Sequence, residues 1–363
     1  MAPSDPSADF LTLRHSISSL RSLLSSFQIA LQSSIQEHPP FPQQPDPLSL
    51  FADAAKLLKA QTTKLSLLII NKPFSPKEVN FILNTLSKSV LPSLMSGWEL
   101  CPAEKYTKAL HEHVKSSLRV LWKELLSLLS TIPDNERGLQ GQNENATLAS
   151  TGVLWEQCDA LIDLGENGLV VFVDKKVKAY GELFEDAIIE LDDWDPDEDD
   201  EDEDEGANNR GKNDVINTPT TSDEERLGEG IAGMALSPLV LLKTCVMKHL
   251  RLIKLLYPAL RKRRIATFPD ATMSVENEGN ARRIQILDTL VELTQHFTEH
   301  ADELAGFLYS GATVDVDDRL GELITESLNT VDFAKLDWYG KEDEFTAWAQ
   351  KWRSRLGELK SIP

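Results

Sequence analysis

The residues most suggestive of chemistry lie at positions 296–300, which read His-Phe-Thr-Glu-His. This H-x-x-E-H order is the signature of inverted zinc proteases, in which two histidines one helical turn apart share a metal ion and a glutamate acts as base. Phe297 and Ala301 continue the apolar stripe of the same predicted helix, so both histidines fall at its edge or outside it. The surrounding helical pattern also lacks the sheet that such peptidases use. We therefore interpret the string as helix-surface residues and predict no metal site.

Other candidates for catalysis are weaker. His111 and His113 lie two residues apart, and such positions diverge on a helix, so they cannot share a metal ion. The sequence has no glycine-rich phosphate loop, no G-x-S-x-G motif and no C-x-x-C pair. Its cysteines are odd in number and far apart, which argues against a disulfide framework and fits a reducing compartment: Cys101, Cys158 and Cys245. We predict a non-enzymatic protein with no catalytic residue and no cofactor.

A run of acidic residues divides the chain. Residues 192–205 read DDWDPDEDDEDEDE, which is twelve carboxylates in fourteen positions with no basic residue. Self-repulsion and hydration both oppose burial of such a run, so we predict a disordered acidic linker over residues 192–235. The run supplies more than half of the net charge of −21, and this balance disfavours direct binding to nucleic acid. Two positions in the linker fit kinase sites, Thr218 before a proline and Ser222 before acidic residues.

A basic segment follows the linker. Between Leu236 and Pro269 the chain has no acidic residue and eight cations: Lys243, Lys248, Arg251, Lys254, Arg261, Lys262, Arg263 and Arg264. The last four resemble a short nuclear import signal. Two alternatives remain open, a solvated basic face and a face that the tethered acidic run covers from within the same chain.

The rest of the chain is patterned as long amphipathic helices. Apolar residues alternate spacings of three and four from Phe10 to Leu31, and again from Val170 to Leu191, which places one seam along each helix. Further helices are predicted over residues 48–70, from Pro76 after a Ser75 cap, and over 103–131, 151–165, 238–256, 281–308, 319–331 and 342–360. In the last of these, Phe345, Trp348 and Trp352 are expected to share one buried face, although a docking surface is the alternative.

These patterns predict an all-α protein of two packed helical bundles joined by the acidic linker. The expected domains are an N-terminal bundle over 1–191, the linker over 192–235 and a C-terminal bundle over 236–363. No apolar run approaches the roughly 18 residues that a membrane span needs, so no membrane association is expected.

Several strings carry a resemblance to a known family. Residues 151–158 (TGVLWEQC), 242–248 (LKTCVMK) and 288–292 (DTLVE), in this order around an acidic break, resemble the cyclin-D-binding protein family, also described as Maid-like, cyclin-D-interacting proteins. The likeness extends from about residue 10 to residue 360. It implies an all-helical protein of cytoplasm and nucleus that binds regulators, including D-type cyclins, and restrains cell-cycle progression. The family supplies no catalytic residue to transfer.

We therefore expect a non-enzymatic regulator that binds cyclin-type or transcription-regulator proteins. An acidic chaperone for basic proteins such as histones is the first alternative, and it depends on the run at 192–205. A helical-bundle cytoskeletal adaptor is the second, and it depends on architecture alone. The partner, the surface that binds it and the oligomeric state stay open at this level.

Overall fold

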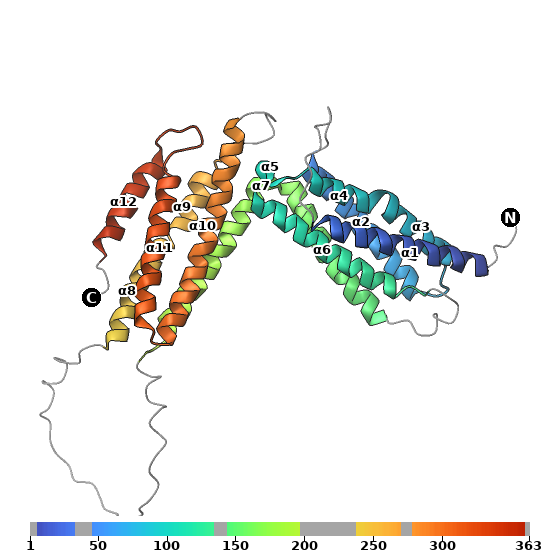
Figure 1. Cartoon of the computed structure of the whole chain (residues 1–363), viewed down its shortest axis with the longest axis horizontal. Coiled ribbons are helices and arrows are strands. Elements are labelled where there is room, and N and C mark those ends of the chain that lie inside the picture. Colours follow the sequence, from blue (N-terminus) through green and yellow to red (C-terminus); the bar gives the residue numbers. More distant parts are fainter. Residues whose placement is uncertain (1–5, 33–45, 134–143, 197–236, 270–277, 360–363) are drawn as a thin grey trace, which may run out of the picture. The chain divides into compact units, whose positions relative to one another are not determined.

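The computed structural model describes residues 6–32, 46–133, 144–196, 237–269 and 278–359, and these form helices without any strand (Figure 1). This confirms the predicted all-α class. In chain order the helices are α1 (Pro6–Ala30), α2 (Pro47–Ile70), α3 (Pro76–Thr85), the π-helical turn η1 (Leu86–Val90), α4 (Leu91–Glu99), α5 (Ala103–Tyr106), α6 (Lys108–Ser130), α7 (Glu144–Asp193), α8 (Pro238–Ile253), α9 (Leu256–Leu260), the π-helical turn η3 (Arg261–Ile265), α10 (Glu278–Tyr309), α11 (Thr313–Phe333) and α12 (Glu344–Glu358).

The helices form two compact units. The first comprises residues 1–176 and 265–291, and the second comprises 177–264 and 292–363. Helices α7 and α10 therefore contribute residues to both units. The division differs from the expected boundary at residue 191, because the second half of α7 packs in the second unit. There the Phe184 ring lies 5.4 Å from the Tyr257 ring of α9, and a Cβ at Gly181 would lie 3.1 Å from two atoms of the same ring.

The first unit is built around the seam predicted for α1. Leu13, Leu20 and Leu24 are buried, and α1 packs against α3 and α6 while α2 packs against α3 and α4 (Figure 1). The helix starts follow the predicted capping chemistry. Ser75 accepts a hydrogen bond from the backbone N–H of Glu78 at 3.4 Å, and Pro76 occupies the first helical position.

The helix predicted over 103–131 is interrupted. Thr107 adopts a φ of 72°, a left-handed conformation that is uncommon for threonine, and it separates α5 from α6. Its hydroxyl accepts the backbone N–H of Leu110 at 3.2 Å and so caps α6. The sequence reading missed this break because neither glycine nor proline marks it.

A glycine three residues later than predicted divides α7. Gly168 has φ 79° and ψ −178°, whereas Gly165, the predicted end, stays helical. A Cβ at Gly165 would lie 2.3 Å from the carbonyl oxygen of Leu48 and 2.7 Å from the Cβ of Ala52. Gly165 is therefore needed for close packing of α7 on α2, and Gly168 for the left-handed turn.

The second unit packs α8 against α11 and α12 around aromatic side chains. Phe345 and Trp352 of α12 are buried, as predicted, while Trp348 is half-buried. The indole N–H of Trp352 donates to the carbonyl oxygen of Leu252 at 2.9 Å. Across both units, none of the described helices is long and apolar enough to cross a membrane.

Candidate interaction sites

The H-x-x-E-H string lies on a groove between α10 and α11. This groove has a volume of about 930 Å³. Both histidines of the motif line it, together with Arg319 and Glu326 of α11. The other lining residues are Glu299, Glu303, Asp318, Gly321, Glu322 and Thr325. Five carboxylates thus surround one guanidinium, so the groove is acidic.

Contacts inside the groove occupy the histidines. Arg319 donates to Nδ1 of His300 at 3.2 Å, and Nε2 of the same ring lies 3.2 Å from a carboxylate oxygen of Glu326. Because Nδ1 accepts, Nε2 carries the proton, and neither nitrogen has a free lone pair for a metal ion. His296 approaches the same Glu326 at 3.8 Å. Among the described residues, no three His, Cys, Asp or Glu side chains converge as a metal ion would require.

The second histidine pair diverges as predicted. The His111 ring stacks on Trp98 with centroids 5.4 Å apart, and its Nδ1 lies 2.9 Å from the carbonyl oxygen of Cys101. The His113 ring instead lies 5.1 Å from Phe172 of α7. Burial, and secondarily the charge of Lys176, lowers the pKa of His113. Both rings therefore pack within the first unit.

The cysteines have the properties of apolar core residues. Cys101 and Cys158 are buried, and Cys245 is half-buried. Burial raises the pKa of all three thiols, that of Cys158 to about 12. A raised pKa keeps a thiol protonated and therefore poorly nucleophilic at neutral pH.

The basic segment contacts carboxylates of α7. Arg251 pairs with the carboxylate of Asp192 at 2.8 Å, and Lys243 donates to the backbone oxygen of the same residue at 3.1 Å. Lys254 pairs with Glu185 at 2.5 Å. Lys243 and Arg251 lie at the C-terminal end of α7, where the helix dipole also favours positive charge. The face that α8 presents here is therefore partly neutralised within the second unit.

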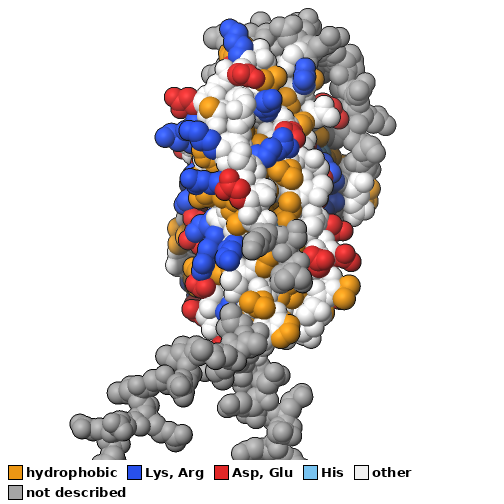
Figure 2. Space-filling view, turned by 90° about the vertical axis from the view of Figure 1, so that its left-hand side faces the viewer, with side chains coloured by type: hydrophobic (Ala, Val, Ile, Leu, Met, Phe, Trp, Pro, Cys, Tyr) orange, Lys and Arg blue, Asp and Glu red, His pale blue; other side chains and the backbone are white. Residues whose placement is uncertain are grey.

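Asp192 is also the first residue of the acidic run, so the run begins on the basic face. The remainder of the run from residue 197, with the candidate phosphorylation residues Thr218 and Ser222, lies outside the described residues. Figure 2 shows lysine and arginine side chains spread over one face of the molecule, interspersed with aspartate and glutamate.

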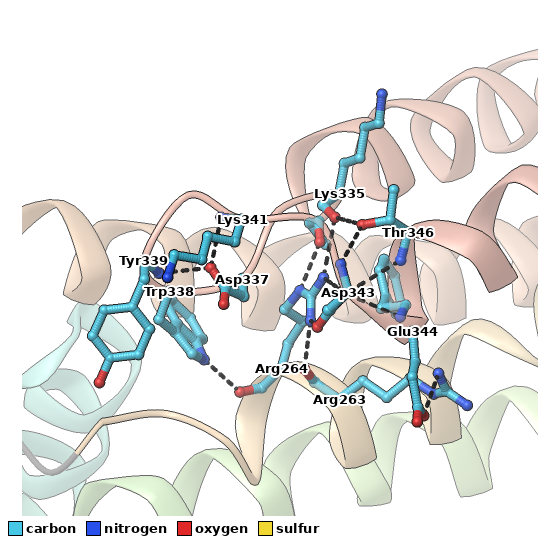
Figure 3. A network of polar contacts seen from close by, with 12 residues as sticks. Arg263, Arg264, Lys335, Asp337, Trp338, Tyr339, Lys341, Asp343, Glu344 and Thr346 are labelled. Carbon is cyan, nitrogen blue, oxygen red and sulfur yellow. Dashed lines mark hydrogen bonds and ion pairs between the residues drawn. The ribbon is translucent and has the colours of Figure 1, made fainter.

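The predicted import cations, Arg261, Lys262, Arg263 and Arg264, have unequal surroundings. Lys262 is exposed, Arg261 is half-buried, and Arg264 is 2% exposed. The Arg264 guanidinium makes two hydrogen bonds to the carboxylate of Asp343, at 2.8 and 3.0 Å (Figure 3). It also lies over the Phe345 ring at 4.4 Å. The sequence reading gave no sign that one of these four cations was a core residue.

Arg264 also joins the loop before α12 to η3. Its side chain donates to the carbonyl oxygens of Ala334 and Lys335 at 2.7 and 3.2 Å. In the other direction, the indole N–H of Trp338 donates to the carbonyl oxygen of Arg264 at 2.9 Å (Figure 3). Asp343 in turn caps α12 through the backbone N–H groups of its first turn. One arginine therefore fixes the loop and the start of α12 together.

This pair predicts a dependence of stability on pH. The hydrogen bonds from Arg264 and its charge lower the pKa of the Asp343 carboxyl below its ordinary value, against a raising effect of partial burial. Such a group stabilises the fold fully above its unfolded pKa of about 3.9, and the stabilisation is lost as the pH falls through the lowered folded pKa. Urea unfolding of Asp343→Asn should show a deficit against wild type at pH 7 that shrinks below about pH 4. A deficit that stays constant down to pH 2 would contradict this assignment.

A second surface lies along α2 and α7 in the first unit. The two helices run antiparallel, since Lys59 pairs with Asp159 at 2.6 Å, the Trp155 indole donates to the Thr63 hydroxyl at 3.0 Å, and Ser66 hydrogen-bonds Thr151. These contacts fix the register of the seam between the two helices.

Three apolar side chains stand outward beside this seam. Leu67 is 53% exposed, Leu148 57% and Trp155 39%. The register places Leu67 between the levels of the other two, so they form one apolar strip, which we call the α2–α7 face. The sequence does not single it out, because Leu67 belongs to a mostly apolar run and Leu148 precedes the predicted helix start. Gly152 between them has open space where a Cβ would point.

The α2–α7 face lies within a segment that matches a known family. Residues 51–197 match the family model described as Grap2 and cyclin-D-interacting, N-terminal. This segment is similar to the cyclin-D-interacting family. The match contains the string at 151–158 and confirms the resemblance predicted from it. The strings at 242–248 and 288–292 lie beyond the matched residues.

A longer similarity extends beyond residues 51–197. Over 310 residues the chain is 24% identical to an uncharacterized protein of Schizosaccharomyces pombe, covering 84% of this chain and 83% of the relative. The shared length therefore includes residues of both units.

Proposed function

We propose that the protein is a non-enzymatic regulator that binds cyclin-type or transcription-regulator proteins and restrains cell-cycle progression. The observation that carries this proposal is the coincidence of the family match at residues 51–197 with the α2–α7 face. An exposed strip of leucine and tryptophan on a rigid helix pair is suited to bind an amphipathic helix of a partner. We propose that it acts in cytoplasm and nucleus.

The contacts of His300 in the groove between α10 and α11 support a non-enzymatic role. The histidines and the arginine of this groove are engaged with its carboxylates, at 2.6–3.2 Å for the hydrogen bonds of Arg319 and His300. A histidine that acts as a general base needs a lone pair directed at a substrate proton, and the Nδ1 lone pair of His300 instead accepts from Arg319.

An acidic chaperone for histones is the competing proposal, supported by the run at 192–205. We would purify the full chain and a variant lacking residues 192–205, and measure binding of each to a D-type cyclin and to histones H3–H4 at 50 and 300 mM salt. The regulator proposal expects cyclin binding that survives the deletion and changes little with salt. Histone binding that the deletion and the higher salt both abolish, with no cyclin binding, would favour the chaperone.

A further inference from the structure

Two of the four predicted import cations contact the start of α12. Arg264 is bound at its guanidinium by Asp343, and Arg263 pairs with Glu344 at 3.2 Å. Figure 3 shows both arginines directed at the beginning of α12. Two neighbouring carboxylates of one helix therefore engage two neighbouring cations of η3.

A receptor that reads a run of lysine and arginine needs those side chains extended and free to meet its own carboxylates. In this fold the η3 backbone is helical, and the Arg264 side chain is buried beneath the loop of residues 334–343. The receptor and the start of α12 therefore compete for the same cations. Binding requires the loop and α12 to leave first.

We propose that residues 261–264 are a concealed binding segment for an acidic nuclear import receptor, and that the N-terminal end of α12 is the latch that closes it. The segment becomes available when Asp343 and Glu344 release Arg264 and Arg263. The inference concerns entry to the nucleus and is separate from partner binding, so loss of cyclin binding would leave it intact.

A further hydrogen bond joins the latch to the loop that covers Arg264. Thr346, in the first turn of α12, donates its hydroxyl proton to the carbonyl oxygen of Lys335 at 2.7 Å, which ties the loop to the helix. The apparent affinity of a receptor for a concealed segment equals its intrinsic affinity reduced by the open fraction. Weakening the latch must therefore raise receptor affinity in proportion to the open fraction, without any change in the cations.

The test uses the full chain and purified importin-α. In Asp343→Ser/Glu344→Gln, serine preserves a cap for α12 while removing the carboxylate partner of Arg264. Thr346→Val is a second opening variant that leaves all charges unchanged. Asp315→Asn/Glu358→Gln is the control, because it removes the same two charges at exposed sites away from η3. Circular dichroism checks that each variant keeps its helices.

Both opening variants should bind importin-α at least tenfold more tightly than wild type and the control. Adding Lys262→Ala to the first variant should abolish the gain, because Lys262 is the exposed member of the segment. A synthetic peptide of residues 259–268 should bind as tightly as the opening variants or more so. The proposal is overturned if wild type already matches the opening variants, if the gain persists without Lys262, or if the peptide does not bind.

Discussion

Replacing Arg264 by methionine should lower the free energy of unfolding by roughly 3 kcal/mol. Methionine keeps an apolar stem of similar length in the core but removes the cation. The change leaves Asp343 without its charged partner and leaves the carbonyl oxygens of Ala334 and Lys335 without the donors that now reach them. Urea unfolding followed by tryptophan fluorescence measures the loss, because Trp338 donates to the backbone of residue 264.

The neighbouring arginine provides the matched control. Arg263 pairs with Glu344, whose side chain is 90% exposed, and such surface pairs contribute at most about 1 kcal/mol. Arg263→Met should therefore unfold close to wild type. Equal losses for the two variants would show that Arg264 is not a core residue.

Replacing two glycines of α7 by alanine should change the free energy of unfolding in opposite directions. Gly165→Ala should lower the free energy of unfolding by about 2 kcal/mol, because its Cβ would meet the Leu48 carbonyl oxygen and Ala52 backbone, which cannot move aside as a flexible side chain can. Gly152→Ala should raise it by about 0.5–1 kcal/mol, since nothing lies within 4 Å of its Cβ position and alanine favours a helix.

Thermal and urea unfolding of both variants test this pair. Hydrogen exchange of the α2 amides adds a local measurement, and Gly165→Ala should accelerate exchange around Leu48 and Ala52. Stabilisation by both substitutions would mean that α2 and α7 do not approach as closely as the structure has them.

Helices whose position depends on neighbouring residues could be predicted from the sequence. The seam from Phe10 to Leu31 follows from apolar spacing, and the start of α3 follows from Ser75 and Pro76, because a helix cap is decided by adjacent residues. Gly165 and Gly168 look alike in sequence, and only the approach of α2 determines which of them stays helical.

The candidate sites depend on contacts between distant segments. A run of four cations is typical of a solvated signal, but Arg264 is a core residue because Asp343, 79 positions later, meets it. The α2–α7 face requires the antiparallel register of two helices about 90 residues apart, which Trp155 and Thr63 fix. Neither pairing leaves a local pattern, so single-sequence reading could not identify them.

The same limit applies to the H-x-x-E-H string. Its helical spacing predicted a buried stripe at Phe297 and Ala301, and both are buried. The expectation of helix-surface residues is wrong for His300, whose side chain is only 11% exposed because it packs against α11. The contacts of His300 with Arg319 and Glu326 could not be predicted, because they depend on how α11 packs against α10.

The most direct test of the account is an equilibrium titration of a purified D-type cyclin with the full chain. It would compare wild type with Leu67→Glu/Leu148→Glu on the α2–α7 face, and with Leu11→Glu/Val314→Glu as a control at residues that are 62% and 74% exposed outside the family match. We expect equal affinity for wild type and control, and at least a tenfold loss for the face variant, about 1.4 kcal/mol of binding free energy. Equal binding by all three proteins, or no binding by wild type, would contradict this expectation.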